Sequence, residues 1–79
     1  MAKRARVKEY TVFVMKERGR GYWVQVPALP GCFTNGDTID EALRNAKEAI
    51  ESHIIALEED GQEVPVERPA AISSVKVAV

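Results

Sequence analysis

The sequence predicts an α+β domain in which an antiparallel-dominated sheet carries one helix packed on one face. Two observations indicate this class: short alternating apolar segments separated by glycine and proline come first, and one long segment with helical periodicity follows them. A last alternating segment comes after the helix. The expected order is therefore β-β-β-α-β, and 79 residues suffice for one domain, which we place at residues 1–79.

The first strand is expected between residues 7 and 17, after a flexible basic arm at residues 1–6. The strand is rich in β-branched and aromatic residues, which favour strands. Because side chains alternate across a strand, one face carries Tyr10, Val12 and Val14, and the other carries Thr11, Phe13 and Met15. Both faces are largely apolar, so we expect both to be covered.

A hairpin joins the first strand to the second. Residues 18–21 (Arg-Gly-Arg-Gly) predict its turn, because glycine accepts the positive φ that tight turns require. The second strand covers residues 22–26, with Trp23 facing away from Tyr22 and Val24. Pro27 and Pro30 then break the ladder because proline has no N–H to donate. Residues 32–35 can form a short third strand.

The helix has clear start and stop signals. Thr38 and Glu41 fit a capping box, in which each side chain satisfies the other residue's backbone N–H. Gly61 suits the position just after the helix, and Pro65 lies beyond it. At about 100° per residue, one apolar stripe carries Ile39, Leu43, Ala46, Ile50, His53 and Leu57, and Ala42, Ala49 and Ile54 widen it.

The last strand is expected at residues 70–79. Val75, Val77 and Val79 alternate there with small or polar residues, which is typical of a strand with one buried face.

The residues for catalysis or metal binding are sparse. The chain has one cysteine, Cys32, and one histidine, His53, which cannot supply the four ligands of a zinc site. They could form a nucleophile–base pair in a residual hydrolase, but no orienting third residue is recognisable, so packing roles are favoured for both. We therefore expect no enzyme, no cofactor and no metal.

Composition points to a soluble cytoplasmic protein. A single cysteine cannot form an internal disulfide, and the basic start of the chain lacks the apolar stretch of a signal peptide. No apolar run approaches the roughly 20 residues needed to cross a bilayer. The net charge of -1, from 11 basic and 12 acidic residues, gives no overall preference for nucleic acid.

Surplus apolar surface indicates an interface. One helix covers one face of the sheet, which leaves Phe13, Met15 and Trp23 on the other face, and Ile55 lies opposite the apolar stripe of the helix. These four residues are the candidate contacts, either for a partner or for self-association. Lys3, Arg4 and Arg6 of the basic arm are candidate phosphate contacts, so a DNA-binding regulator is the alternative from another class.

Several separated motifs resemble the HicB-type antitoxin family. Residues 21–33 read GYWVQVPALPGCF, residues 36–43 read GDTIDEAL, and the helix closes with LEEDG at residues 57–61. The likeness covers residues 7–69, in the family's order. The signature loop contains Pro27, Leu29, Pro30, Gly31 and Cys32. For this loop two roles stay open, one in redirecting the chain and one in shaping a binding surface.

The resemblance implies more than the spacing does. It implies a truncated ribonuclease-H-like unit without catalytic acidic residues, which neutralises a small HicA-type mRNA-cleaving toxin and commonly forms homo-oligomers. Many family members add a C-terminal DNA-binding segment, and this chain departs there, since its residues after Pro69 read as a strand. We expect a solitary, non-enzymatic antitoxin domain. An orphan homo-oligomer without its toxin remains an alternative.

Overall fold

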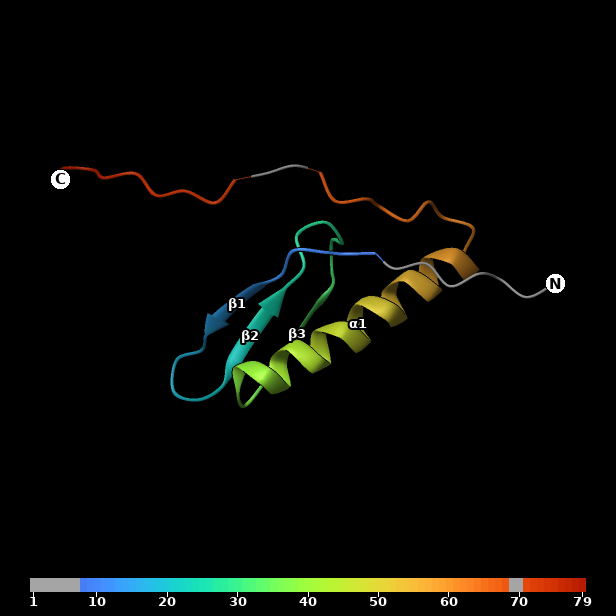
Figure 1. The fold of residues 1–79 in the computed structure, drawn as a ribbon, viewed down its shortest axis with the longest axis horizontal. Helices are drawn as coiled ribbons and strands as arrows, with labels where there is room; N and C mark the ends of the chain where they lie inside the picture. Colours follow the sequence, from blue (N-terminus) through green and yellow to red (C-terminus); the bar gives the residue numbers. More distant parts are fainter. Residues whose placement is uncertain (1–7, 69–70) are drawn as a thin grey trace.

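The protein is an α+β unit with a three-stranded antiparallel sheet and one helix packed across it (Figure 1). A computed structural model describes residues 8–68 and 71–79. The elements are β1 (Phe13–Lys16), β2 (Tyr22–Gln25), β3 (Phe33–Gly36) and α1 (Ile39–Glu59). The predicted class and the order of the three strands and the helix are confirmed.

The sheet has the simple order β1-β2-β3, with both neighbouring pairs antiparallel. Its register places Met15 opposite Trp23, and Trp23 opposite Asn35. β1 is shorter than the predicted strand at residues 7–17, because the ladder extends only as far as β2 lies opposite it. After Gln25 the chain leaves the ladder and enters the proline loop.

The core lies between the sheet and α1. Val24 is fully buried against Ala42 and Ala46 of the helix. A second cluster of Val26, Leu29 and Cys32 continues the core toward the far end of the helix. Side chains from the start of the chain also pack on these clusters: Tyr10, Val12 and Val14. The face that carries Tyr22 and Val24 is therefore the covered face of the sheet.

Both ends of α1 are capped by local hydrogen bonds. The Thr38 hydroxyl accepts from the Glu41 N–H at 3.1 Å, as predicted. The Glu41 carboxylate, however, accepts from the Asp37 N–H at 2.8 Å, one residue before the cap. At the other end Gly61 has a φ of +71°, and the chain closes with hydrogen bonds from residues 61 and 62 to the carbonyls of residues 58 and 57. This is a Schellman motif.

The helix is rotated relative to the predicted apolar stripe. Ala46 is buried as predicted, and so is Ala42, which was predicted at the margin of the stripe, whereas Ile39 and Leu43 are 48% and 42% exposed. The small alanines lie where α1 approaches the sheet most closely, so the longer side chains are displaced to the flank.

The predicted last strand is wrong for this chain on its own. Residues 71–79 form no strand pairs, and Val75, Val77 and Val79 are exposed. Alternation correctly indicates an extended segment, but residues 71–79 run past the sheet without pairing with any of its strands (Figure 1).

Candidate protein-binding site

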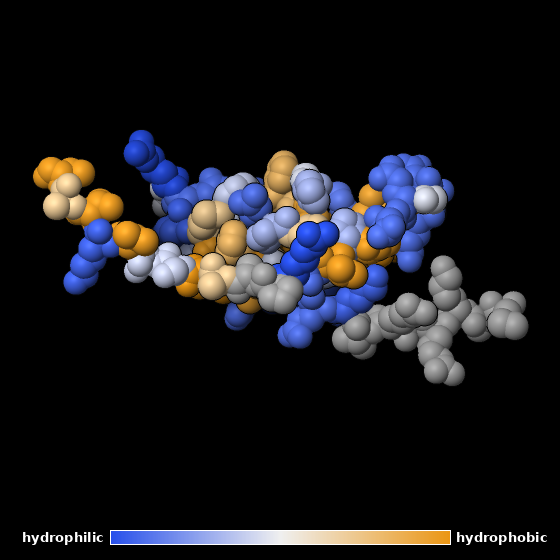
Figure 2. Space-filling view, turned by 90° about the horizontal axis from the view of Figure 1, so that it is seen from above, coloured by the Kyte–Doolittle hydropathy of each residue, from blue (hydrophilic) through white to orange (hydrophobic). Residues whose placement is uncertain are grey.

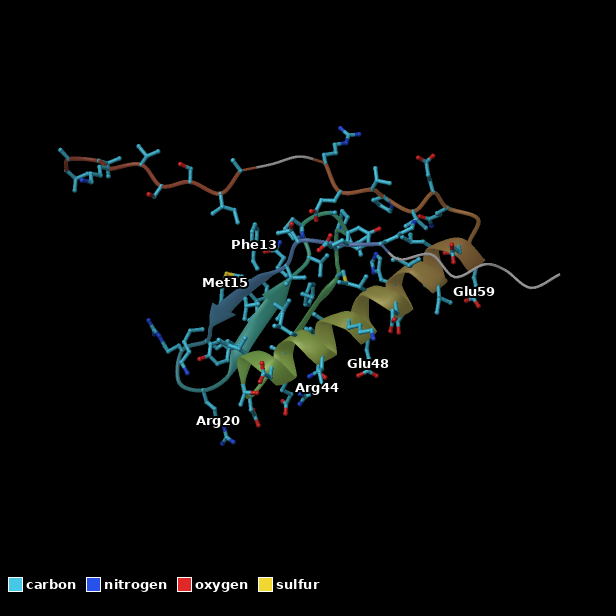
Figure 3. The ribbon with its side chains drawn as sticks, viewed as in Figure 1. Phe13, Met15, Arg20, Arg44, Glu48 and Glu59 are labelled. Atoms are coloured by element: carbon cyan, nitrogen blue, oxygen red, sulfur yellow. The ribbon has the colours of Figure 1, made fainter. Side chains whose placement is uncertain are left out.

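The uncovered face of the sheet carries an apolar surface. Because side chains alternate along a strand, the residues between the core positions of β1, β2 and β3 project away from α1. We call four of them the aromatic face: Phe13, Met15, Trp23 and Phe33. Figure 3 shows Phe13 and Met15 on the side of β1 that points away from the helix.

The aromatic face is continuous across the three strands. Met15 lies opposite Trp23 in the ladder, and the rings of Trp23 and Phe33 have centroids 6.4 Å apart at an angle of 45°. Phe33 is 61% exposed and Met15 38% exposed, while Phe13 and Trp23 are half-buried. Gln25, the neighbour of both Phe13 and Phe33, and Asn35, opposite Trp23, are polar residues on the same face.

Three of the four candidate contacts predicted from sequence are thus brought together, and Phe33 joins them. Phe33 was missed because its face depends on how β3 pairs with β2. The sequence did contain one signal: adjacent side chains on a strand point to opposite faces, so a buried Cys32 implies that Phe33 faces away from the core.

Ile55 lies apart from this surface. It is 54% exposed on α1, and α1 covers the other face of the sheet. The structure therefore does not combine Ile55 with the aromatic face into one site.

The signature loop consists of two consecutive β-turns. The Leu29 N–H donates to the Val26 carbonyl at 3.1 Å, which closes the first turn around Pro27. The Cys32 N–H donates to the Leu29 carbonyl at 2.9 Å, which closes the second. These bonds, together with a 3.1 Å bond from the Val26 N–H to the Cys32 carbonyl, tie the ends of the loop together.

The second turn explains the Pro-Gly pair. Pro30 supplies the fixed φ of the turn's second position, and Gly31, with a φ of +83°, supplies its third. Leu29 and Cys32 are buried beneath the loop, whereas Pro30 and Gly31 are exposed. The loop therefore redirects the chain and also closes the second core cluster.

Cys32 has the environment of a packing residue. Burial raises the pKa of its thiol, whereas a nucleophilic cysteine needs a lowered pKa. Among residues 8–68 and 71–79, no group of three histidine, cysteine, aspartate or glutamate side chains could hold a metal ion.

The segment after α1 is tied to the residues before β1. The Tyr10 hydroxyl donates to the Pro65 carbonyl at 2.7 Å. The Glu67 carboxylate accepts from the Thr11 N–H and, at 2.7 Å, from the Thr11 hydroxyl. The hydrogen bonds from the Thr11 backbone and side chain lower the pKa of Glu67.

An open groove of about 870 Å³ lies between this segment and the start of β1. Most of its lining is apolar, including Phe13, Pro27, Val66 and Ile72. Two carboxylates, Glu63 and Glu67, and one guanidinium, Arg68, are also at its walls.

Charge is unevenly distributed along the molecule. Residues 37–63 contain nine acidic and two basic side chains, and most of the acidic ones lie on α1. Arg44, Glu48 and Glu59 are visible on the exposed side of the helix in Figure 3. Lys3, Arg4 and Arg6, the predicted phosphate contacts, lie outside the described residues.

Within the described part of the chain, no helix combines the length and the hydrophobicity that a membrane span requires.

Comparison with known proteins gives a consistent result. The family model described as "HicB_like antitoxin of bacterial toxin-antitoxin system" matches residues 10–78. A UPF0150 protein of Thermoplasma acidophilum is 49% identical over 57 residues, which are 72% of this chain and 83% of that protein. An uncharacterised 14.9 kDa protein of Haemophilus phage HP1 is 55% identical over 49 residues, which are 62% of this chain but 37% of that protein.

A solved structure is also similar. The N-terminal domain of the Burkholderia pseudomallei antitoxin HicB superimposes with a TM-score of 0.62 at 39% sequence identity. The match covers 77% of this chain and 69% of that one.

Proposed function

Because the chain belongs to the HicB_like antitoxin family of bacterial toxin–antitoxin systems, we propose that it neutralises a small HicA-type mRNA-cleaving ribonuclease by binding it. Binding occludes the active or RNA-binding surface of the toxin. The protein itself contributes contacts and no catalytic step, and the complex forms in the cytoplasm, where the toxin meets its mRNA.

The aromatic face is the observation that carries this proposal. Exposed apolar patches mark sites of association, and the centres of protein interfaces are enriched in aromatic residues and methionine. Trp23 is the central anchor because it contacts Phe33 on one side and pairs with Met15 on the other. A large, half-buried aromatic residue held by its neighbours is the type of residue that dominates binding energy.

The acidic helix supports the same partner. A ribonuclease must attract the phosphates of RNA, so it needs a cationic surface. The excess of acidic side chains on α1 would steer such a surface toward this protein. Electrostatic attraction would speed the encounter, and the aromatic face would hold the complex.

The test begins with tagged full-length protein used to capture partners from its native host. Captured material is released and assayed for cleavage of mRNA, and purified protein is then added back. We expect a small basic ribonuclease whose activity the wild-type protein inhibits. The Phe13→Ala/Trp23→Ala variant should weaken inhibition by about 1,000-fold, because truncating hot-spot residues costs roughly 2 kcal/mol each.

A matched control is Ile55→Ala, which removes an exposed apolar side chain from the other layer of the fold. It should inhibit as the wild type does. Circular dichroism of all variants checks that they are folded. Equal inhibition by the wild type and the folded aromatic-face variant would remove this surface from the proposal, and capture of no ribonuclease would count against the antitoxin function.

A further inference from the structure

Residues 73–79 form an exposed apolar segment, which we call the valine segment. Val75 and Val77 are 83% and 77% exposed, and Val79 is fully exposed. Their spacing places all three on one side of an extended chain. Figure 2 shows this end of the protein as a narrow, largely apolar extension that stands clear of the body. Three alternating valines in water are unfavourable unless something covers them.

The body of the fold has a strand edge for such a segment. β1 is at the border of the sheet, and within the described residues only β2 pairs with it. Its outer N–H and C=O groups are therefore a template for a further strand. The groove of about 870 Å³ begins at this border, where Phe13 forms one wall and Val66 and Ile72 are on the other.

The valine segment cannot use this edge in its own molecule as the chain is arranged. Bonds from Tyr10 to Pro65 and from Thr11 to Glu67 hold residues 65–67 beside the start of β1. Ile72 still lines the groove with Phe13, but none of residues 73–79 does. Figure 1 shows the chain continuing past the turn between β1 and β2, beyond the end of its own strand.

The dimensions agree with an extension that does not fold back. The radius of gyration is 15.3 Å, whereas a compact chain of this length has about 12 Å. Seven extended residues reach about 23 Å, enough to cross the whole edge of a four-residue strand.

From this arrangement we propose that the valine segment of one copy occupies the groove of a second copy and adds to the outer edge of its β1. The valines then pack on the apolar wall formed by Phe13, Val66 and Ile72. Lys76, the one charged residue of the segment, lies on the side opposite the valines and therefore stays in solvent when the valines enter the groove.

The exchange is reciprocal, because each copy has one groove and one valine segment. Two copies related by a two-fold axis satisfy both, which closes the assembly at a dimer. The strand predicted at residues 70–79 is then completed in the assembly by the other chain.

Native lysines allow a direct test with the full chain. Copies labelled with ¹⁴N and ¹⁵N are unfolded together, refolded as an equal mixture and treated with a short amine-reactive cross-linker. We expect peptides that join Lys76 to Lys16 or Lys8, about half of them containing one light and one heavy partner. If these cross-linked peptides are all of a single isotope, the segment folds back on its own chain and the proposal is wrong. A monomer without such peptides also overturns it.

Charge placement in the segment provides a second test. Val75→Lys/Val77→Lys should raise the dimer dissociation constant by about tenfold or more in sedimentation equilibrium, because two buried valines become charged. Ser74→Lys/Ala78→Lys adds the same charge on the face that already carries Lys76, and this control should remain dimeric. A dimer that survives the valine substitutions rules out the exchange.

The outcome is separable from that of the proposed function. Toxin inhibition is measured with the same valine variants. Loss of the dimer in these variants with inhibition retained supports the exchange alone. A wild type that dimerises through the valine segment but inhibits no ribonuclease would contradict the antitoxin role alone.

Discussion

Gly36 has no side chain, and this allows α1 to approach β3 more closely than a methyl group would permit. A Cβ built on Gly36 would lie 2.5 Å from the Ala42 backbone nitrogen and 2.8 Å from its Cα. Both atoms belong to the first turns of the helix, so they cannot move without shifting the helix. The need for a residue without a side chain at Gly36 follows only from the packing, because no sequence pattern shows how closely the helix approaches β3.

Gly36→Ala should therefore lower the free energy of unfolding by about 1–3 kcal/mol, the usual cost of forcing extra volume into a packed region. Urea denaturation followed by circular dichroism measures this change. Gly31→Ala is a useful comparison, because no atom lies within 4 Å of its Cβ position and only the positive φ is unfavourable there. A Gly36→Ala protein as stable as the wild type would show that α1 and β3 are not in such close contact.

At the level of elements, features set by neighbouring residues follow from the sequence, whereas features set by contacts distant in the chain do not. The helix was predictable because Thr38, Glu41 and Gly61 act within a few residues of the positions they stabilise. The faces of β1 and β2 followed from alternation alone. Periodicity could not give the ends of the strands, because these depend on where the neighbouring strand has residues to pair with. It also could not show which side of α1 is buried most deeply, because this depends on how closely the helix approaches β3.

The hydrogen bonds between residues 10–11 and 65–67 were not predictable from any sequence pattern. This connection depends on the Glu67 carboxylate being ionised while it accepts both Thr11 hydrogen bonds. Since these bonds lower the pKa of Glu67, they favour the ionised form in the folded protein. The anchoring is then present above the ordinary glutamate pKa, and it is lost as the pH falls through the depressed value.

We expect the Thr11 amide resonance to titrate with a midpoint below the ordinary glutamate range in NMR spectra recorded at decreasing pH. Glu67→Gln should abolish this titration, and Glu63→Gln, a neighbouring exposed carboxylate, should preserve it. A midpoint at the ordinary value would indicate that the carboxylate is not held by Thr11.

At the level of the whole molecule, a net charge of -1 conceals a strong division. Seven of the 11 basic residues lie in the first 20 positions, and nine of the 12 acidic residues lie between positions 37 and 63. The overall count therefore suggested electrostatic neutrality, while the fold concentrates negative charge along one helix. Composition alone could not reveal this, because it depends on which charges share an element.

The division leads to a prediction for association with the captured toxin. Glu48→Lys/Glu51→Lys should slow the association rate by about tenfold at low salt and change the dissociation rate little, because exposed charges act mainly on the encounter. Stopped-flow measurements at several salt concentrations separate the two rates. Glu9→Lys/Glu17→Lys changes the net charge equally outside α1 and should have a smaller effect. Equal slowing by both pairs would mean that only total charge matters.

The two linked turns of the signature loop have a consequence for the entropy of binding. Three backbone hydrogen bonds and the buried side chains of Leu29 and Cys32 fix the connection between β2 and β3, the strands that carry Trp23 and Phe33. The two rings are therefore held in place before any partner arrives. A partner that docks there need not pay for ordering a flexible loop, so more of the contact energy remains as affinity.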